Sequence, residues 1–463
     1  MRLFHDFIIW LNGYVWGPPM LILLFGTHIF LTLRLRFIQR HILLAIKLSF
    51  KNDGGGYGDI SHFGALTTAL AATIGTGNIV GVATAVALGG PGAVLWCWLT
   101  GVFGIATKYG EAVLAVRYRE KTSDGTMLGG PMYALAKGLN AKWLAVLFCI
   151  FTAIAAFGIG NMVQANSIAV LVNETFSLSP YITGLVMTAI VAVVILGGVR
   201  SIAGVCEKLV PFMAVLYIIG CAAILVMNAQ VLPATVMLIV KSAFTPQAAG
   251  GGFIGASVMM AARFGIARGL FSNESGMGSA PILAAAAQTK NPVRQALVSS
   301  TGTFWDTVVL CAMTGLVIVS EVIISPSDLG GLTGAALTKG AFARIPVIGP
   351  VVLTGGLLTF VFSTILGWSY YGERAVEYLV GKSGIKPYRV LWVIAVFIGS
   401  VISLPFVWDF ADLMNALMAL PNLISLILLN GIIVAETRKY LWNGNIEMTH
   451  ASCAYRDSVG DGY

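Results

Sequence analysis

Two polar, glycine-rich interruptions lie within otherwise apolar stretches of the sequence. The first reads Ile-Gly-Thr-Gly-Asn at 74–78, and the second reads Ser-Asn-Glu-Ser-Gly-Met-Gly at 272–278. Unpaired backbone groups are costly in hydrocarbon, so irregular backbone persists at membrane depth only where it lines a cavity or is buried by protein. A single Gly-rich stretch is also compatible with close helix packing. Two such stretches favour a binding site built from a pair of broken helices.

A broken helix can bind both ends of an ion-coupled amino acid. The N-terminus of its second half presents free N–H groups, which suit a carboxylate, whereas unwound carbonyl groups suit a small cation. Polar side chains at membrane depth usually face an interior cavity, so we predict that Ser272, Asn273 and Ser275 line this site. Glu274 lies in the same interruption. We interpret it as a gating or coupling group, or alternatively as a cap of the second half-helix.

Ser363 and Thr364 are adjacent hydroxyl residues within an apolar run. Together with carbonyl groups from the first interruption they would form an uncharged, all-oxygen shell. Such a shell suits a hard monovalent cation better than a divalent ion, which needs carboxylates, and sodium is the predicted ion. The alternative is that both hydroxyls bond back to carbonyls of their own helix.

Phe157, Asn161 and Gln164 follow one another at i, i+4 and i+7, which places them on one helical face. They either line the substrate cavity or link helices by hydrogen bonds. Trp368 follows Thr364 by one turn. We predict that it covers the apolar side of a small substrate, although tryptophan also anchors membrane interfaces.

Several charged residues lie inside apolar stretches, where charges are rare and need partners. Lys108 and Glu111 stand at i and i+3, so we expect them to pair with each other. Further charges of this kind are Asp306, Arg263, Arg268, and Glu373 with Arg374.

The composition requires that the elements carrying these residues cross a membrane. Of the 463 residues, 57% are hydrophobic and only 10% are charged, whereas soluble proteins carry roughly 25% charged residues. The mean hydropathy is +0.86. Apolar runs predict about eleven transmembrane helices in one membrane domain: 15–34, 62–88, 91–116, 143–172, 180–199, 209–228, 253–288, 296–322, 346–379, 388–406 and 412–435.

The two interruptions fall in the second and seventh of these spans, so each opens a set of five. Because five is odd, the sets begin on opposite sides of the membrane, which predicts an inverted repeat typical of secondary transporters. The predicted parts of the single domain 1–463 are an accessory span at 15–34, repeat one at 62–228, repeat two at 253–435 and a cytoplasmic tail at 436–463.

The basic residues predict the orientation of these spans. About 21 of the 28 Lys and Arg residues follow odd-numbered spans, and the positive-inside rule assigns those segments to the cytoplasm. The N-terminus is then outside and the C-terminus cytoplasmic, in a multi-pass protein of the plasma (inner) membrane. This scatter of basic residues does not indicate nucleic-acid binding, and we expect membrane lipid, but no obligate protein partner, around the chain.

Enzyme motifs are lacking in the sequence. The five histidines show no HExxH spacing, and there is no Walker loop, no GxSxG elbow and no cysteine pattern for a metal or a disulfide framework. A membrane-embedded enzyme is therefore the weakest reading. An uncoupled uniporter or channel, and a transporter coupled to protons through Glu274, remain alternatives to sodium coupling.

Five motifs together resemble the sodium:alanine symporter family (alanine or glycine:cation symporters) over nearly the whole chain. They are Gly75-Thr76-Gly77-Asn78-Ile79, Gly89-Gly90-Pro91-Gly92-Ala93 with Trp96 and Trp98, Asn161-Met162-Val163-Gln164, Phe271 to Gly278, and Gly367-Trp368-Ser369-Tyr370-Tyr371-Gly372-Glu373. One departure is Leu95-Trp96-Cys97-Trp98, where the family typically has Phe-Trp-Met-Trp.

The resemblance implies an all-α membrane protein with a leucine-transporter-type fold of five plus five inverted spans and one extra N-terminal span. It implies a symporter that imports alanine or glycine with Na⁺. Thr76, Gly77 and Asn78, with Ser275 and Gly276, are then expected to hold the carboxylate and ammonium groups, and Gln164 and Trp368 to line the side-chain space. The carbonyls of Ala71 and Ile74 and the hydroxyls of Ser363 and Thr364 are expected to bind sodium.

Overall fold

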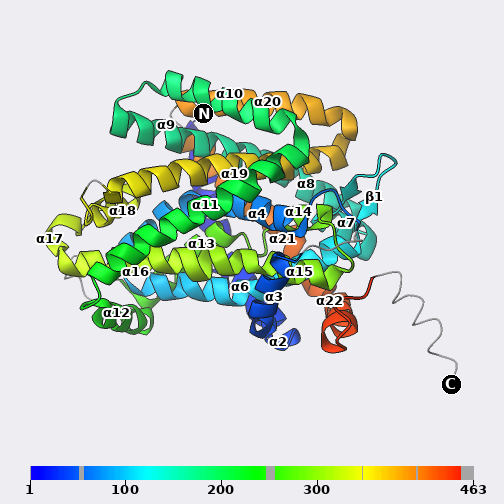
Figure 1. Cartoon of the computed structure of the whole chain (residues 1–463), viewed down its shortest axis with the longest axis horizontal. Coiled ribbons are helices and arrows are strands. Elements are labelled where there is room, and N and C mark those ends of the chain that lie inside the picture. Colours follow the sequence, from blue (N-terminus) through cyan, green and yellow to red (C-terminus); the bar gives the residue numbers. More distant parts are fainter. Residues whose placement is uncertain (1, 52–56, 247–255, 347, 403–404, 450–463) are drawn as a thin grey trace.

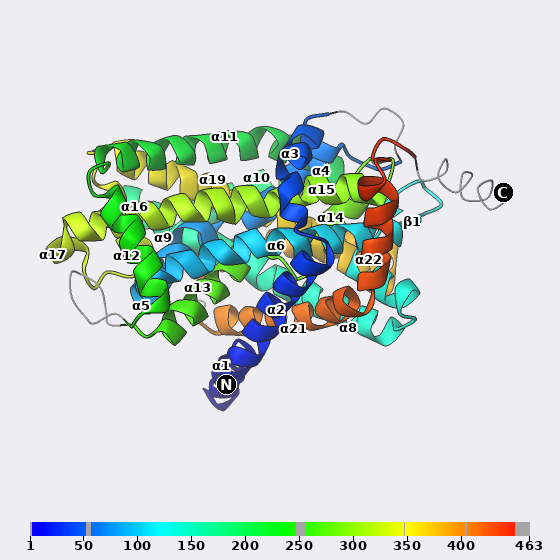
Figure 2. The same cartoon turned by 90° about the horizontal axis from the view of Figure 1, so that it is seen from below.

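The computed structural model describes residues 2–51, 57–246, 256–346, 348–402 and 405–449, and these form a helical bundle (Figures 1 and 2). Within them the only paired strands are the short antiparallel β1 (Glu120–Lys121) and β2 (Met127–Leu128). Most helices run along one direction. The short helices α12 (Leu232–Phe244), α17 (Pro326–Leu329) and α18 (Gly334–Phe342) lie at one end of the bundle, and β1 and α22 (Asn430–Thr437) lie at the other.

Seven described helices are long and apolar enough to cross a membrane. They are α6 (Gly92–Arg117), the continuous pair α8 (Lys142–Phe157) and α9 (Val163–Phe176), α11 (Gly198–Met227), the continuous pair α15 (Pro292–Thr303) and α16 (Ala312–Ile324), α19 (Ile348–Val380), α20 (Ile385–Val401) and α21 (Pro405–Leu428). Two bent pairs raise this number to nine. The predicted eleven would also need α10 (Pro180–Leu196) and the pair α13 (Val258–Asn273) and α14 (Pro281–Ala286), so that count stays a prediction.

The first predicted span, 15–34, differs from the structure. The chain forms α1 (Arg2–Val15) and α2 (Pro18–Arg34), which meet at an angle of 41°. Pro18 and Pro19 explain the bend, because proline lacks an N–H group and its ring blocks continuation of the preceding helix. Residues 34–61 then contain α3 (Ile42–Ser49), and α7 (Pro131–Tyr133) precedes α8.

The predicted tail, 436–463, begins with helical residues. Helical structure continues past residue 436, through the end of α22 and a π-helical turn at Arg438–Trp442. Residues 450–463 lie outside the described residues, and so do residues 253–255 at the start of the seventh predicted span.

Both predicted helix breaks are present. The first separates α4 (His62–Thr73) from the helix that begins with a π-helical turn at Gly77–Gly81 and continues as α5 (Val82–Gly89), with an angle of 51° between the two halves. The second separates α13 from α14. It contains three residues with positive φ, namely Glu274 (52°), Gly276 (91°) and Gly278 (87°), and a helix cannot continue through that conformation.

The two broken helices are enclosed by other spans. The half-helix α4 packs against α11 and α19, while α13 packs against α5 and α6. Asn78, Ser272, Ser275 and Ser363 are all less than 2% exposed. The breaks therefore lie inside protein, as irregular backbone at membrane depth requires.

Candidate functional site

All four residues predicted to bind sodium come together where α4 ends beside α19. Ser363 Oγ lies 3.2 Å from the carbonyl oxygen of Ala71, and Thr364 Oγ1 lies 3.4 Å from that of Ile74. Both hydroxyls also lie within reach of the Phe360 carbonyl, at 2.8 and 3.0 Å. A hydroxyl has one proton and two lone pairs. When the proton is donated to Phe360, the lone pairs remain directed at the first break.

The ending of α4 explains why a carbonyl is free there. In a continuous helix, the N–H of Gly75 would bond to the Ala71 carbonyl. It donates instead to Asn78 Oδ1, at 2.9 Å. The site thus has two carbonyl and two hydroxyl oxygens and no carboxylate, which fits the chemistry of a monovalent cation.

Asn78 and Ser272, one from each break, are joined through Asp306. Asn78 Nδ2 donates to Asp306 Oδ1 at 2.7 Å, and Ser272 Oγ donates to Asp306 Oδ2 at 2.9 Å. Gly77 permits this proximity, because a Cβ atom at that position would lie 3.1 Å from Ser272 Cα. Thr76, the residue before Gly77, is buried beside this contact.

Asp306 was not among the predicted site residues. It is fully buried in the π-helical stretch Phe304–Cys311 between α15 and α16, and Thr307 is its third hydrogen-bond donor. Within the described residues no salt bridge to it is found. The signal that could have identified it was a lone aspartate in an apolar span, but nothing in the sequence gave its partners.

Glu274 connects the second break to α19. Its Oε1 accepts a hydrogen bond from Trp368 Nε1 at 3.1 Å, and its Oε2 accepts one from Ser279 Oγ at 2.5 Å. Trp368 is buried and packs so closely on Gly160 that a Cβ atom there would lie 2.3 Å from Trp368 Cβ. The indole therefore lies between the second break and the middle of the α8–α9 helix.

The remaining residues of the second break bond to α13, α15 and α6. Asn273 Oδ1 accepts the N–H of Ser275 at 2.9 Å, and Ser275 Oγ lies 3.0 Å from Thr303 Oγ1. The N–H groups of Gly276 and Gly278 both donate to Glu111 Oε1, at 3.1 and 3.0 Å.

This arrangement corrects the expected pairing of Lys108 with Glu111. Glu111 Oε1 also accepts Asn422 Nδ2 at 2.7 Å, whereas Lys108 Nζ is buried without a hydrogen-bond partner. Free N–H groups in an irregular turn attract an anion, and here they hold the carboxylate in place.

Phe157, Asn161 and Gln164 lie around a π-helical turn, Gly158–Met162, rather than on one regular helical face. The ring of Phe157 contacts that of Trp392 on α20, with centroids 5.4 Å apart, and Asn161 Nδ2 donates to the Trp392 carbonyl at 2.9 Å. Gln164 Nε2 donates to the Ile159 carbonyl at 2.9 Å. Phe157 and Asn161 thus link two helices, whereas Gln164 bonds within its own helix. None of these contacts joins the three residues to the breaks, so their role in the pocket stays a prediction.

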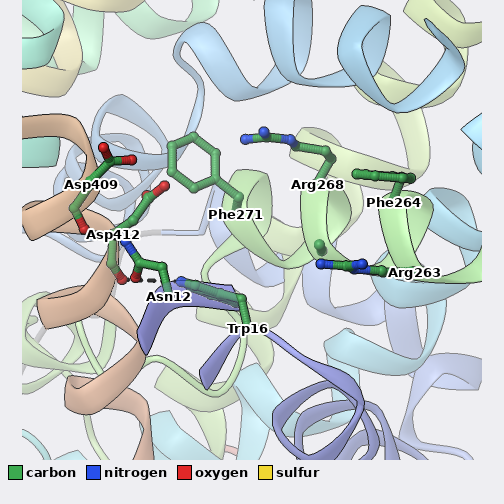
Figure 3. Close-up of a pocket in the computed structure, with 9 residues that line it drawn as sticks. Asn12, Trp16, Arg263, Phe264, Arg268, Phe271, Asp409 and Asp412 are labelled. Atoms are coloured by element: carbon green, nitrogen blue, oxygen red, sulfur yellow. Dashed lines mark hydrogen bonds between the residues drawn. The ribbon is translucent and has the colours of Figure 1, made fainter. Parts of the chain in front are cut away.

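A cavity of about 210 Å³ lies between α1, α13 and α21 (Figure 3). Arg263 and Arg268 face Asp409 and Asp412 across it. Phe271 forms part of its wall, and a Cβ atom on Gly77 would lie 3.3 Å from the Phe271 ring. This cavity therefore approaches the breaks from the side that the charge pattern assigns to the exterior.

The opposite side of the breaks is closed by contacts between the chain before α4 and the chain after α14. Arg119 Nη1 donates to the carbonyls of Ala285 and Ala287 at 3.0 and 2.9 Å, and Nη2 donates to that of Tyr57 at 3.0 Å. Burial lowers the pKa of Arg119 to about 10, so the guanidinium stays charged at neutral pH. We call Arg119 with segments 57–60 and 285–289 the inner latch.

Comparison with known proteins identifies the family of this chain. The sequence profile described as the sodium:alanine symporter family matches residues 1–452. The chain is 53% identical to the sodium/alanine symporter AgcS of Methanococcus maripaludis over 436 residues, which cover 93% of this chain and 95% of AgcS. It is 36% identical to two Bacillus subtilis proteins. These are the probable sodium/glutamine symporter GlnT, covering 93% of this chain and 89% of GlnT, and the putative sodium/proton-dependent alanine carrier protein YrbD, covering 92% and 90%.

Among solved structures, that of MhsT in complex with L-phenylalanine superposes with a TM-score of 0.53 at 16% identity, covering 83% of this chain and 90% of MhsT. At this identity the likeness concerns the fold, and it confirms the leucine-transporter-type architecture. With a family profile that spans nearly the whole sequence, the chain belongs to the sodium:alanine symporter family, a family of membrane transporters rather than enzymes.

Proposed function

We propose that this transporter imports alanine or glycine together with Na⁺ by alternating access. The observation that carries the proposal is the convergence of four uncharged oxygen ligands, from Ala71, Ile74, Ser363 and Thr364, directly beside a break that leads into Asn78. An ion bound there would be shared between a broken helix and α19. Its binding and the shape of the neighbouring break would therefore be coupled.

Sodium would act by fixing the first break. The ion replaces the helical hydrogen bond that the Ala71 carbonyl would otherwise accept from the Gly75 N–H. It thereby stabilises the conformation in which Asn78 Oδ1 accepts that N–H. Thr76, Gly77 and Asn78 would then already be positioned to bind the substrate carboxylate. If sodium binds the outward-facing state better than the inward-facing state, it shifts the population toward the state that accepts substrate.

The substrate is proposed to be small because the space between the breaks is limited. Gly77 lies against Ser272, and Trp368 lies against Gly160 and Glu274, so little room remains for a side chain longer than a methyl group. The ammonium group of the substrate would lie near Ser275 and Gly276. Two relatives are named for alanine and one for glutamine, which leaves the choice of substrate to experiment.

Proton coupling is a second candidate, because Glu274 is a buried carboxylate at the site and the name of one relative mentions both sodium and protons. Its carboxylate accepts hydrogen bonds from Trp368 and Ser279. We expect Glu274→Gln to retain sodium-dependent transport under the sodium proposal. If a pH gradient drives uptake in the wild type but not in this variant, proton coupling through Glu274 is favoured.

Binding measurements with purified protein test the sodium proposal directly. Alanine affinity should be at least about tenfold higher in sodium chloride than in potassium chloride at equal ionic strength, because the ion orders the substrate break. Equal affinity in both salts would favour an uncoupled carrier or a channel. The orientation is proposed to be N-terminus outside, and proteolysis of right-side-out vesicles would check it.

A further inference from the structure

A small cavity lies on the inner-latch side of the second break, enclosed by α4, α6, α14 and α15. It measures about 10 Å³, which is about the volume needed to hold one water molecule. Its polar lining residues are Thr73 and Ser299, whose hydroxyls have hydrogen-bond partners, and Lys108 on α6 and Asn273 at the end of α13, which reach it from opposite elements. Most of the other wall residues are alanine.

Lys108 and Asn273 are both buried, and the side-chain nitrogen of each lacks a hydrogen-bond partner. Lys108 and Asn273 are 4% and 1% exposed, and neither Lys108 Nζ nor Asn273 Nδ2 has a hydrogen-bond partner. The orientation of the amide is determined by its other end, because Asn273 Oδ1 accepts the N–H of Ser275 at 2.9 Å. Two unsatisfied donors, one of them cationic, therefore share one cavity.

Neighbouring carboxylates do not pair directly with Lys108. Glu111 Oε1 is held by two backbone N–H groups and by Asn422. Glu274 is held by Trp368 and Ser279. A buried ammonium group without a bonded partner is costly, and intramembrane charges of this kind usually serve a transported group. Two hydrogen-bond donors, one of them cationic, are best complemented by a negatively charged acceptor such as a carboxylate.

The cavity lies where a substrate would leave. It is bounded by the half-helices α4 and α14, which are held together beyond the cavity by the inner latch. When those half-helices separate, the cavity becomes the first space between the breaks and the predicted cytoplasm. A zwitterion that leaves the first break must then carry its carboxylate past Glu111 and Glu274, which would repel it.

We propose that Lys108 Nζ and Asn273 Nδ2 form a transit site for the substrate carboxylate on the inner side of the breaks. This inference rests on the proposed amino-acid transport. It assigns a substrate contact to Lys108 and a second role to Asn273, which is already predicted to line the substrate site. Lys108 offsets the repulsion from the two glutamates. Asn273, at the start of the second break, passes the carboxylate from the first break to the Lys108 ammonium group. In the latched conformation the site is contracted to the volume of a water molecule.

Alanine exchange measured separately on each face of reconstituted vesicles tests this site. In Lys108→Met the half-saturating alanine concentration on the inner face should rise about tenfold or more, as expected for a lost charge-assisted contact. The value on the outer face should stay within about threefold of wild type. Lys108→Arg keeps the charge and should recover part of the inner-face affinity.

Asn273→Asp is the second variant, because it retains an oxygen that accepts the Ser275 N–H and replaces the free donor with a carboxylate oxygen, which repels an anionic substrate group. It should also weaken inner-face affinity selectively. Lys142→Met makes the same chemical change as Lys108→Met at the exposed start of α8 and should match wild type on both faces.

If the Lys108 and Asn273 variants change alanine affinity equally on both faces, the two residues have only a structural role, and the proposal is overturned. Unchanged affinity on both faces would overturn it too, since an ordered water would then suffice for the two donors. The exchange is run at equal sodium on both sides. A failure of sodium coupling would therefore appear in the wild type as sodium-independent exchange, whereas a failure of the transit site would appear as lost asymmetry in the variants.

Discussion

At the scale of single residues, a side-chain amide replaces one helical hydrogen bond beside the proposed ion site. Asn78 Oδ1 accepts a hydrogen bond from the N–H of Gly75, and Asn78 Nδ2 donates one to Asp306. The same side chain thus connects the first break, beside the proposed sodium site, with the carboxylate that joins the two breaks. A substitution at the proposed sodium site should therefore also change binding at the proposed substrate site.

The hydroxyls of α19 provide the first prediction. Ser363→Ala and Thr364→Ala should each raise the half-saturating sodium concentration by about tenfold, because each removes one oxygen from a charged ligand. Maximal uptake at saturating sodium should change less. Thr359→Val is the matched control, since Thr359 bonds only to carbonyls of its own helix, at 2.8 and 2.9 Å. Unaltered sodium activation in both alanine variants would remove Ser363 and Thr364 from the ion site.

Asp306 provides the second prediction. In Asp306→Asn the charge that accepts hydrogen bonds from Asn78 and Ser272 is lost, so the two breaks should separate and alanine affinity should fall by about tenfold or more. Equilibrium binding of labelled alanine measures this. Ser320→Ala, on the same continuous helix but bonded to Asn228, should bind alanine normally. Wild-type affinity in Asp306→Asn would show that the carboxylate does not hold the substrate site.

At the scale of elements, the inner latch holds the two broken helices together at one end. Backbone hydrogen bonds run from the N–H of Asp59 to the Ala286 carbonyl at 2.7 Å and from the N–H of Gln288 to the Ile60 carbonyl at 2.8 Å. Gly58 is required there, because a Cβ atom would lie 2.3 Å from the carbonyl carbon of Ala287. Opening on this side must break the latch, whereas the cavity of Figure 3 lies on the other side.

The third prediction concerns this latch. Arg119→Gln and Gly58→Ala should both favour separation of α4 from α14, because the first removes three charge-assisted hydrogen bonds and the second places an atom inside neighbouring backbone. Hydrogen exchange at the amides of Asp59 and Gln288 should accelerate by about tenfold, and exchange in α10 should not change. Arg117→Gln, whose partner Glu436 lies on α22, is the control. Unchanged exchange in both latch variants would show that these contacts do not close the inner side.

At the scale of the whole molecule, the sequence predicts the apolar helices and both breaks because each depends on local composition or on spacing along one helix. The placement of Ala71 and Ile74 beside Ser363 and Thr364 is expected from the family resemblance, and the structure brings these four residues together. The partners of Asp306, Glu111 and Lys108 could not be predicted in the same way. A charge in an apolar span shows only that it needs compensation, and which group supplies it depends on how distant helices pack. The bend after α1 had a local cause in Pro18 and Pro19 that a hydropathy reading overlooks.

The fourth prediction concerns cooperation between the ion and the substrate in stabilising the fold. A ligand at one hundred times its dissociation constant adds about 2.7 kcal/mol to the free energy of unfolding. If sodium orders the break that binds alanine, the two together should raise the unfolding temperature by more than the sum of their separate effects. Simple additivity in a thermal-shift series with sodium, potassium and alanine would indicate independent sites.

The central claim is tested most directly by uptake of labelled alanine into liposomes that contain the purified protein. An inward sodium gradient should drive accumulation above the external concentration, and an equal potassium gradient should give only equilibration or no uptake. Recovery of chemically unchanged alanine would also exclude an enzymatic reaction. Accumulation that is indifferent to sodium would contradict the account, remove the ion from the site formed by Ala71, Ile74, Ser363 and Thr364, and direct attention to protons and Glu274.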